Sequence, residues 1–189
     1  MKRLLILTLL VSTGILTAKA QSNCTYKSNA QIQNFGMLFR ACEGKSYFET
    51  FEISGQMVSM MLGSKATISA ETNIAKAGLD PKNTSGISYI RIININHHCK
   101  GFFQDAYNII NKNDYKLLTS MAQDGQKIAC YCIPIISLDG RNTGLLSELV
   151  LIREGNKENS IVIIGGKIDI KNIRSIPGVE TNTGTGGSR

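Results

Sequence analysis

Apolar and polar positions recur along this chain in patterns that predict short strands and helices. Residues 47–53 (YFETFEI) alternate between the two kinds of side chain and include aromatic rings, which indicates a strand. Ser54 follows as the N-cap of a short helix that ends at Gly63. Residues 87–95 (ISYIRIINI) are dense in β-branched side chains and predict a second strand.

The second half of the chain predicts further elements of both kinds. Residues 102–110 carry apolar side chains at i, i+4 and i+7, which indicates an amphipathic helix. The other predicted elements are a weak helix over 68–79, a helix over 115–121 capped by Asp114, strands over 127–136, 145–153 and 160–168, and a short helix capped by Asp169 with Ile170 on its buried side. Pro134 predicts an edge or a bulge, and Gly165-Gly166 predicts a bulge or a bend.

These elements follow one another in the order β-α-β-α-α-β-β-β-α. Two strand–helix units followed by a meander are typical of an α+β domain. We predict a single domain over residues 35–176, whose one mixed or mainly antiparallel sheet carries helices on one face. A polar, flexible leader over 21–34 precedes the domain, and a disordered Gly/Thr-rich tail over 177–189 follows it.

The start of the chain has the pattern of a secretory signal peptide over residues 1–20. Lys2 and Arg3 precede an apolar run over 4–16, and small residues end at Ala20. The run is shorter than the ~20 apolar residues that span a bilayer, and no later segment is as apolar. We therefore predict cleavage before Gln21, export of the mature chain and no transmembrane segment.

Net charge argues against a nucleic-acid partner. Loss of three basic residues with the signal peptide leaves 18 basic residues against 14 acidic ones, so the mature charge is +4 and the whole-chain value is +7. The remaining Lys and Arg residues are scattered and form no basic stripe, whereas nucleic-acid-binding proteins cluster them on one face.

The chain has five cysteines, which are Cys24, Cys42, Cys99, Cys130 and Cys132. In an exported protein disulfides persist, and an odd count leaves at least one thiol free or paired between chains. Cys24 lies near the cleavage site, but Gln21 and Asn23 do not suit a lipoprotein signal. We therefore favour an ordinary residue of a flexible leader at Cys24 over a lipid anchor.

A pair of cysteines supplies the first candidate for chemistry. Cys130 and Cys132 stand two apart in a predicted strand, so their side chains should point to the same face. A disulfide between them would be strained and easily reduced, and with His97 and Cys99 the pair could instead hold a metal. Buried cysteines, or a bond from one of the pair to Cys99 or Cys42, are the favoured interpretation, and we predict no metal and no cofactor.

Two further features of the sequence bear on binding and on catalysis. Met57, Met60 and Met61 recur at helical spacing, which favours core packing over a soft binding groove. The chain lacks a nucleophile elbow, a phosphate-binding loop, a zinc-protease helix and a dinucleotide fingerprint. We therefore predict that the protein is not an enzyme and has no catalytic residues.

Two blocks of the sequence point to a family. Residues 35–62 run through an aromatic segment, a turn with Gly, an alternating strand and a Met-rich helix. Residues 147–176 run through two apolar strands around a polar turn, then Gly, then Ile-Asp-Ile opening a helix. With 115–136 between them at fitting spacing, these blocks resemble domain of unknown function 4252, a family of small exported proteins of Gram-negative bacteria. The resemblance implies export and one compact domain, and it implies no activity and no functional residues.

Two hypotheses about function follow. The preferred one is an exported, non-enzymatic module of the periplasm or extracellular space that binds an unknown envelope protein or ligand, or senses envelope conditions. The alternative is a thiol-redox or metal-binding protein that uses His97, Cys99, Cys130 and Cys132.

Overall fold

The computed structural model describes five stretches of the chain, which are Cys24 and residues 26–63, 86–96, 99–156 and 158–172. Four predictions lie outside these residues, namely the signal peptide over 1–20, the helix over 68–79, the role of His97 and the tail over 177–189.

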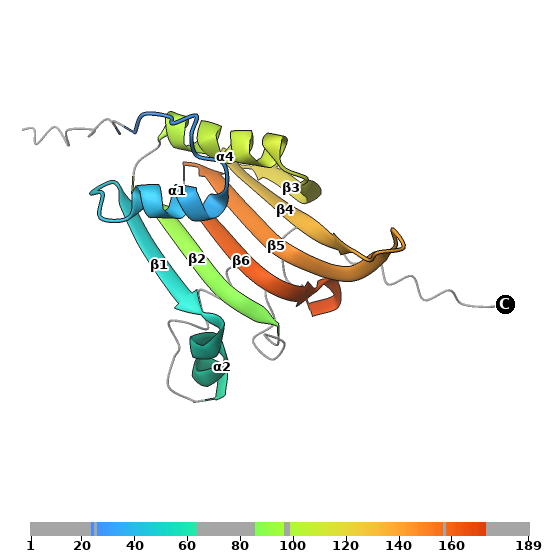
Figure 1. Ribbon diagram of the computed structural model, residues 1–189. Helices are drawn as coiled ribbons and strands as arrows, with labels where there is room; N and C mark the ends of the chain where they lie inside the picture. The colour runs from blue at the N-terminus through green and yellow to red at the C-terminus, as the bar shows by residue number, and fades with distance from the viewer. Residues whose placement is uncertain (1–23, 25, 64–85, 97–98, 157, 173–189) are drawn as a thin grey trace, which may run out of the picture.

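One antiparallel sheet of six strands forms the frame of the domain, in the order β1-β2-β6-β5-β4-β3 (Figure 1). The strands are β1 (Phe48–Ser54), β2 (Ile87–Ile95), β3 (Lys116–Gln123), β4 (Gln126–Ile136), β5 (Asn142–Gly155) and β6 (Ser160–Asp169). The helices are α1 (Phe35–Cys42), α2 (Gly55–Gly63), α4 (Lys100–Lys112) and the 3₁₀ helix η1 (Ile170–Asn172). The predicted α+β class is therefore confirmed, and the sheet is antiparallel rather than mixed.

Two helices cover part of one face of the sheet. In Figure 1, α1 and α4 lie across this face, which we call the helix face. Phe35 and Leu38 of α1 and Phe102 of α4 pack with Ile93 of β2 and Val150 of β5 in one buried cluster. The apolar side chains of both helices recur on a single stripe, which is why burial against the sheet stabilises them.

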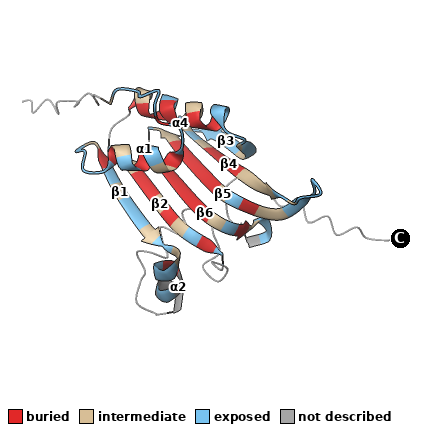
Figure 2. Cartoon of the chain, viewed as in Figure 1, coloured by how far each residue is buried: buried red, intermediate tan, exposed pale blue. Residues whose placement is uncertain are grey.

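The opposite face of the sheet is apolar as well. Its buried cluster includes Leu149 and Leu151 of β5 together with Val162 and Ile164 of β6. Among the described helical residues, Val58 of α2 alone joins this cluster, so the prediction that every helix lies on one face is wrong for α2. Figure 2 shows that burial concentrates in the central strands, as expected for strands that are apolar on both faces.

Several local predictions are confirmed. Ser54 caps α2, because its Oγ accepts a hydrogen bond from the Met57 backbone N–H at 3.3 Å. The pairing of β4 with β5 shifts register at Pro134, which marks a bulge. The register of β6 shifts beside Gly165-Gly166 against both of its neighbours.

The helix predicted over 115–121 is wrong, because residues 116–121 lie in β3 and Tyr115 directly precedes it. Asp124 and Gly125 have φ values of 52° and 73°, and they join β3 to β4 in a two-residue hairpin. Two adjacent residues with positive φ are typical of the type I′ turn, whose twist matches the twist of paired strands. This turn and the ladder to β4 outweigh the helical spacing of the apolar residues.

Tyr89 of β2 reaches across β6 to β5 on the helix face. Gly165 stands opposite both Tyr89 and Glu148 in the strand ladders, and the Tyr89 hydroxyl donates to the Glu148 carboxylate at 2.7 Å. A Cβ atom at Gly165 would overlap the Tyr89 ring. Gly165 therefore makes room for the contact between β2 and β5.

We predict that Gly165→Ala lowers the free energy of unfolding by about 1–3 kcal/mol, the usual range for overpacking. Urea unfolding followed by circular dichroism measures the change. In a Tyr89→Ala background the same substitution should be much less damaging, because the overlapping ring is gone. An equal loss in both backgrounds would contradict this account of Gly165.

Candidate functional site

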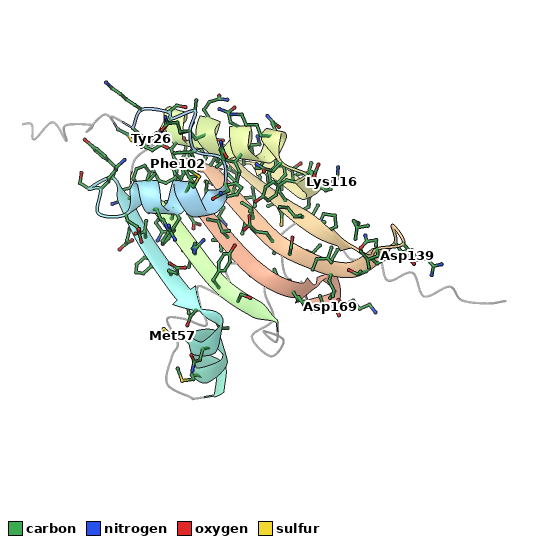
Figure 3. The ribbon with its side chains drawn as sticks, viewed as in Figure 1. Tyr26, Met57, Phe102, Lys116, Asp139 and Asp169 are labelled. Carbon is green, nitrogen blue, oxygen red and sulfur yellow. A yellow bond between two sulfur atoms is a disulfide. The ribbon has the colours of Figure 1, made fainter. Side chains whose placement is uncertain are left out.

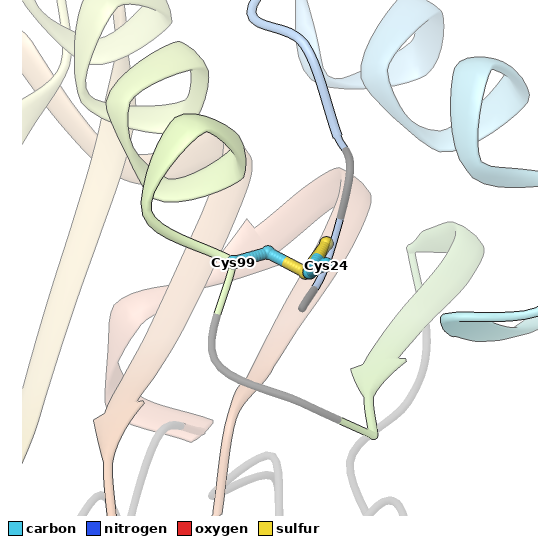
Figure 4. Close-up of a disulfide and its surroundings, with 2 residues drawn as sticks. All are labelled: Cys24 and Cys99. Carbon is cyan, nitrogen blue, oxygen red and sulfur yellow. A yellow bond between two sulfur atoms is a disulfide. The ribbon is translucent and has the colours of Figure 1, made fainter. Parts of the chain in front are cut away.

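The N-terminal segment is fastened to the domain by a disulfide. Cys24 and Cys99 are bonded, with their Cα atoms 5.4 Å apart, and Cys99 immediately precedes α4 (Figure 4). The bond joins residues 75 positions apart in the chain. Sequence reasoning placed Cys24 in a flexible leader and missed this pairing.

Asp105 of α4 holds the same segment by hydrogen bonds. Its carboxylate, only 2% exposed, accepts from the Tyr26 hydroxyl at 2.7 Å and from the Asn29 backbone N–H at 3.0 Å, and also from the Ser28 hydroxyl. Burial and the nearby Asp105 carboxylate together raise the pKa of Tyr26 well above its usual value. Three donors on one buried carboxylate make this cluster an anchor for the residues before α1.

Helix α1, which sequence reasoning missed, begins directly after this anchored segment. The Asn34 side chain accepts a hydrogen bond from the Met37 backbone N–H at 2.9 Å and so caps α1. Ile32, just before the cap, is buried in the cluster of the helix face. Asn34 before an apolar run is a recognised start signal for a helix, and it was the available clue.

The structure does not bring the predicted thiol cluster together. Cys130 and Cys132 share one face as predicted, and both are buried in the cluster opposite the helices. Cys99 belongs to the cluster on the helix face, so the sheet separates it from this pair. Within the described ranges no group of three or more His, Cys, Asp or Glu side chains is placed to hold a metal.

The three free thiols, Cys42, Cys130 and Cys132, are buried, and burial disfavours the charged thiolate form. Burial raises the pKa of Cys130 to about 12, and the neighbouring Cys132 adds to the shift. Burial likewise raises the pKa of Cys42 to about 12. Because the thiolate is the reactive form, these groups should be slow nucleophiles at neutral pH.

A second polar cluster lies on the helix face beside α1. Glu148 accepts hydrogen bonds from the Tyr89 hydroxyl and from the Tyr115 hydroxyl, which approaches from the chain just before β3. Arg91 pairs with Glu52 at 2.8 Å and stacks on the Tyr89 ring, with 4.4 Å between guanidinium carbon and ring centroid. Burial and the Glu148 carboxylate raise the pKa of both tyrosines well above 10. These groups satisfy one another across the sheet, which suits a structural network.

A polar hollow of about 380 Å³ lies near the β5–β6 loop. Arg153 and Glu158 in its wall form an ion pair at 3.3 Å, and the Ser160 hydroxyl donates to the same carboxylate. The rest of the wall combines four asparagines with three aliphatic residues, namely Asn94, Asn96, Asn156 and Asn159 with Ile92, Ile95 and Val162. Its polar groups suit hydrogen bonding to a small polar molecule.

Exposed apolar side chains are spread along the end of the sheet where α2, η1 and the β4–β5 hairpin lie. We call this region the apolar end, and it is defined by Met57, Met60, Ile136, Leu138 and Ile170, all of which are exposed. The predictions that the Met57 and Met60 side chains fill the core and that Ile170 is buried are therefore wrong. Helical spacing showed that the methionines share one side of α2, but it did not show that this side is exposed to solvent.

Comparison with known proteins identifies the family. Residues 42–176, well over half of the chain, match the family described as Domain of unknown function (DUF4252). The chain belongs to the DUF4252 family. Searches of curated proteins and of solved structures give no match. Among the described residues of this DUF4252 protein, no helix has the length and hydropathy to cross a membrane.

We predict that Asp105→Ala lowers the free energy of unfolding by about 3 kcal/mol, because it leaves buried donors without their charged acceptor. Urea unfolding of the oxidised protein measures the loss. Asp114→Ala, at an exposed carboxylate, is the matched control and should change stability by less than ~0.5 kcal/mol. Equal effects of the two variants would contradict the anchoring role of Asp105.

Alkylation followed by intact-mass measurement should count three thiols in the denatured protein without reductant and five with it. In the folded protein the same thiols should react far more slowly than a free cysteine at pH 8, because burial holds their pKa values high. Fast labelling of Cys130 or Cys132 in the folded protein would revive the thiol-redox hypothesis.

Proposed function

We propose that this DUF4252 protein is an exported, non-enzymatic binding module of the bacterial cell envelope. The observation that carries the proposal is the Cys24–Cys99 disulfide. Disulfides form and persist outside the cytosol, and they are rare where thiols are kept reduced. The predicted signal peptide covers residues 1–20, and Cys24 is the fourth residue after it. This position suits a chain from which the signal peptide is cleaved before the Cys24–Cys99 bond forms.

The disulfide also bears on how the protein would be held in the envelope. A lipid anchor at Cys24 would need the sulfur of that residue for a thioether to the lipid. The same sulfur is bonded to Cys99, and one sulfur cannot form both bonds. We therefore propose a mature chain without a lipid on Cys24.

The proposal that the protein is not an enzyme rests on how its titratable groups are used. The hydroxyls of Tyr26, Tyr89 and Tyr115 donate to carboxylates, and their pKa values are raised away from neutrality. Catalytic acids and bases usually have pKa values moved toward the working pH, which is the opposite direction. This pattern supports a structural use of the polar clusters.

The proposal that the protein binds a partner rests on the apolar end. Leu138 at the tip of the β4–β5 hairpin is fully exposed, and Ile136 beside it is 53% exposed. A single exposed apolar side chain is ordinary, but several at one end of a domain can mark a site of contact with a protein or a membrane. We take the apolar end as the contact region of the module.

Cell fractionation of a Gram-negative host that expresses the full chain tests the proposal. We expect the protein in the periplasmic or extracellular fraction, with a mass that begins at Gln21 and the Cys24–Cys99 bond formed. A variant with Leu5→Arg and Leu9→Arg, which interrupts the apolar run, should stay uncleaved in the cytosol. An uncleaved, fully reduced wild-type protein in the cytosol would contradict the proposal.

A further inference from the structure

We infer that the apolar end docks on the surface of an anionic lipid bilayer, with α2 and the β4–β5 hairpin as its apolar contacts. This inference rests on the proposed export and names the partner of the contact region. Figure 3 places Met57, Asp169 and Asp139 along one end of the sheet, whereas Tyr26 and Phe102 lie at the other. Three separate elements thus present their tips on the same side of the domain.

The tip of the β4–β5 hairpin is held rigid by its own hydrogen bonds. The Ser137 N–H donates to the Arg141 carbonyl at 2.9 Å, and the Gly140 N–H donates to the Ser137 carbonyl at 2.9 Å. The Arg141 N–H also donates to the Ser137 hydroxyl and to the Asp139 carboxylate. Leu138 stands in this hydrogen-bonded turn with its side chain fully exposed, so it offers an apolar contact at the tip.

The second apolar contact is a short helix without charge. The nine residues of α2, Gly55–Gly63, contain no acidic or basic side chain. Val58 packs toward the sheet, whereas Met57 and Met60 are 47% and 60% exposed. Met57 and Met60 therefore present flexible apolar side chains to solvent, as in surfaces that adapt to a partner.

Basic side chains accompany the apolar ones. Lys167 of β6 and Lys171 of η1 are exposed, and the Arg141 side chain is 86% exposed at the hairpin tip. Two carboxylates also lie here, but Asp139 is paired with Arg141 at 3.2 Å and Asp169 accepts from the Lys171 N–H at 2.9 Å. Arg141 and Asp139 cancel as an ion pair, so the five side chains together carry a charge of +1, from Lys167 and Lys171 against Asp169. This small positive balance favours contact with anionic lipid headgroups.

The positions of these elements favour a flat partner over a single pocket. The β4–β5 hairpin and η1 lie at the same end of the sheet, because Leu145 near the start of β5 pairs with Asp169 and η1 lies against β5. In Figure 1, α2 lies at the far edge of the same end, beyond β1 and β2. Side chains spread across the width of the sheet can all touch a planar surface at once. A pocket on a partner protein would accommodate only one of these elements.

The expected affinity is that of a reversible attachment. One acyl chain alone gives only marginal membrane binding, and two signals are needed for stable anchoring. Leu138, Ile136, Met57 and Met60 supply the exposed apolar side chains, and the two lysines add an electrostatic contribution that salt should weaken.

A tryptophan probe tests the inference directly, because the chain has no tryptophan. In the oxidised mature chain, Leu138→Trp should shift its fluorescence to shorter wavelength on vesicles of phosphatidylglycerol and phosphatidylethanolamine, more than on neutral phosphatidylcholine. Leu117→Trp is the matched control and should not shift, because Leu117 is 55% exposed but lies on the edge strand β3, paired with Tyr131 and outside the apolar end. The absence of a shift at position 138, or equal shifts at both, would overturn the inference.

Vesicle co-sedimentation provides a second measurement that needs no probe. Leu138→Ser combined with Met60→Ser should weaken binding to the anionic vesicles about tenfold or more, which corresponds to about 1.4 kcal/mol. Leu117→Ser with Met37→Ser, both exposed elsewhere, should leave binding within about twofold. Circular dichroism checks that all variants fold.

The outcomes separate this inference from the proposed function. A protein that is exported and oxidised but stays in the supernatant with both kinds of vesicle overturns lipid docking and leaves the proposed function standing. A tryptophan shift that depends on protein concentration without vesicles would indicate contact between copies of the chain, and it too would overturn lipid docking.

Discussion

The structure depends on two central strands that are apolar on both faces. In β5, Val150 and Ile152 face the helices while Leu149 and Leu151 face away, and β6 follows the same rule. Such strands fold stably only if both faces leave water, since each buried aliphatic side chain contributes about 1.5–3 kcal/mol. The core is therefore a sheet with an apolar layer on each side, and the other elements are placed by that requirement.

The layer on the helix face needs the N-terminal segment to be complete. Ile32 and the aromatic side chains of α1 fill it, and the Cys24–Cys99 bond with Asp105 keeps the chain before α1 against α4. Polar groups that enter this layer satisfy one another, as Glu148 does with two tyrosines. These side chains thus connect β2, β5 and the chain before β3 by hydrogen bonds, while the apolar end carries side chains that the fold does not bury.

The sequence predicted those parts of the structure that depend on interactions within one segment, and it missed parts that depend on distant segments. Strand β2 and helix α4 were predicted close to their observed bounds, because β-branched density and helical periodicity lie within one segment. Strand β3 was not, because its pairing depends on a turn and a partner strand. The Cys24–Cys99 pair and the outward side of α2 were also missed, since both depend on which distant segments meet. The two-residue Asp124-Gly125 turn was the clue that could have corrected β3.

Native-state hydrogen exchange of backbone amides tests the central claim most directly. If β5 and β6 form a core that is closed on both faces, their amides at 149–152 and 161–164 should exchange only by global unfolding and be the slowest in the domain. Amides of the edge strands β1 and β3 should exchange faster, through local opening. Exchange in β6 as fast as in β1 would contradict the account, because it would mean that one face of the central strands is open to water.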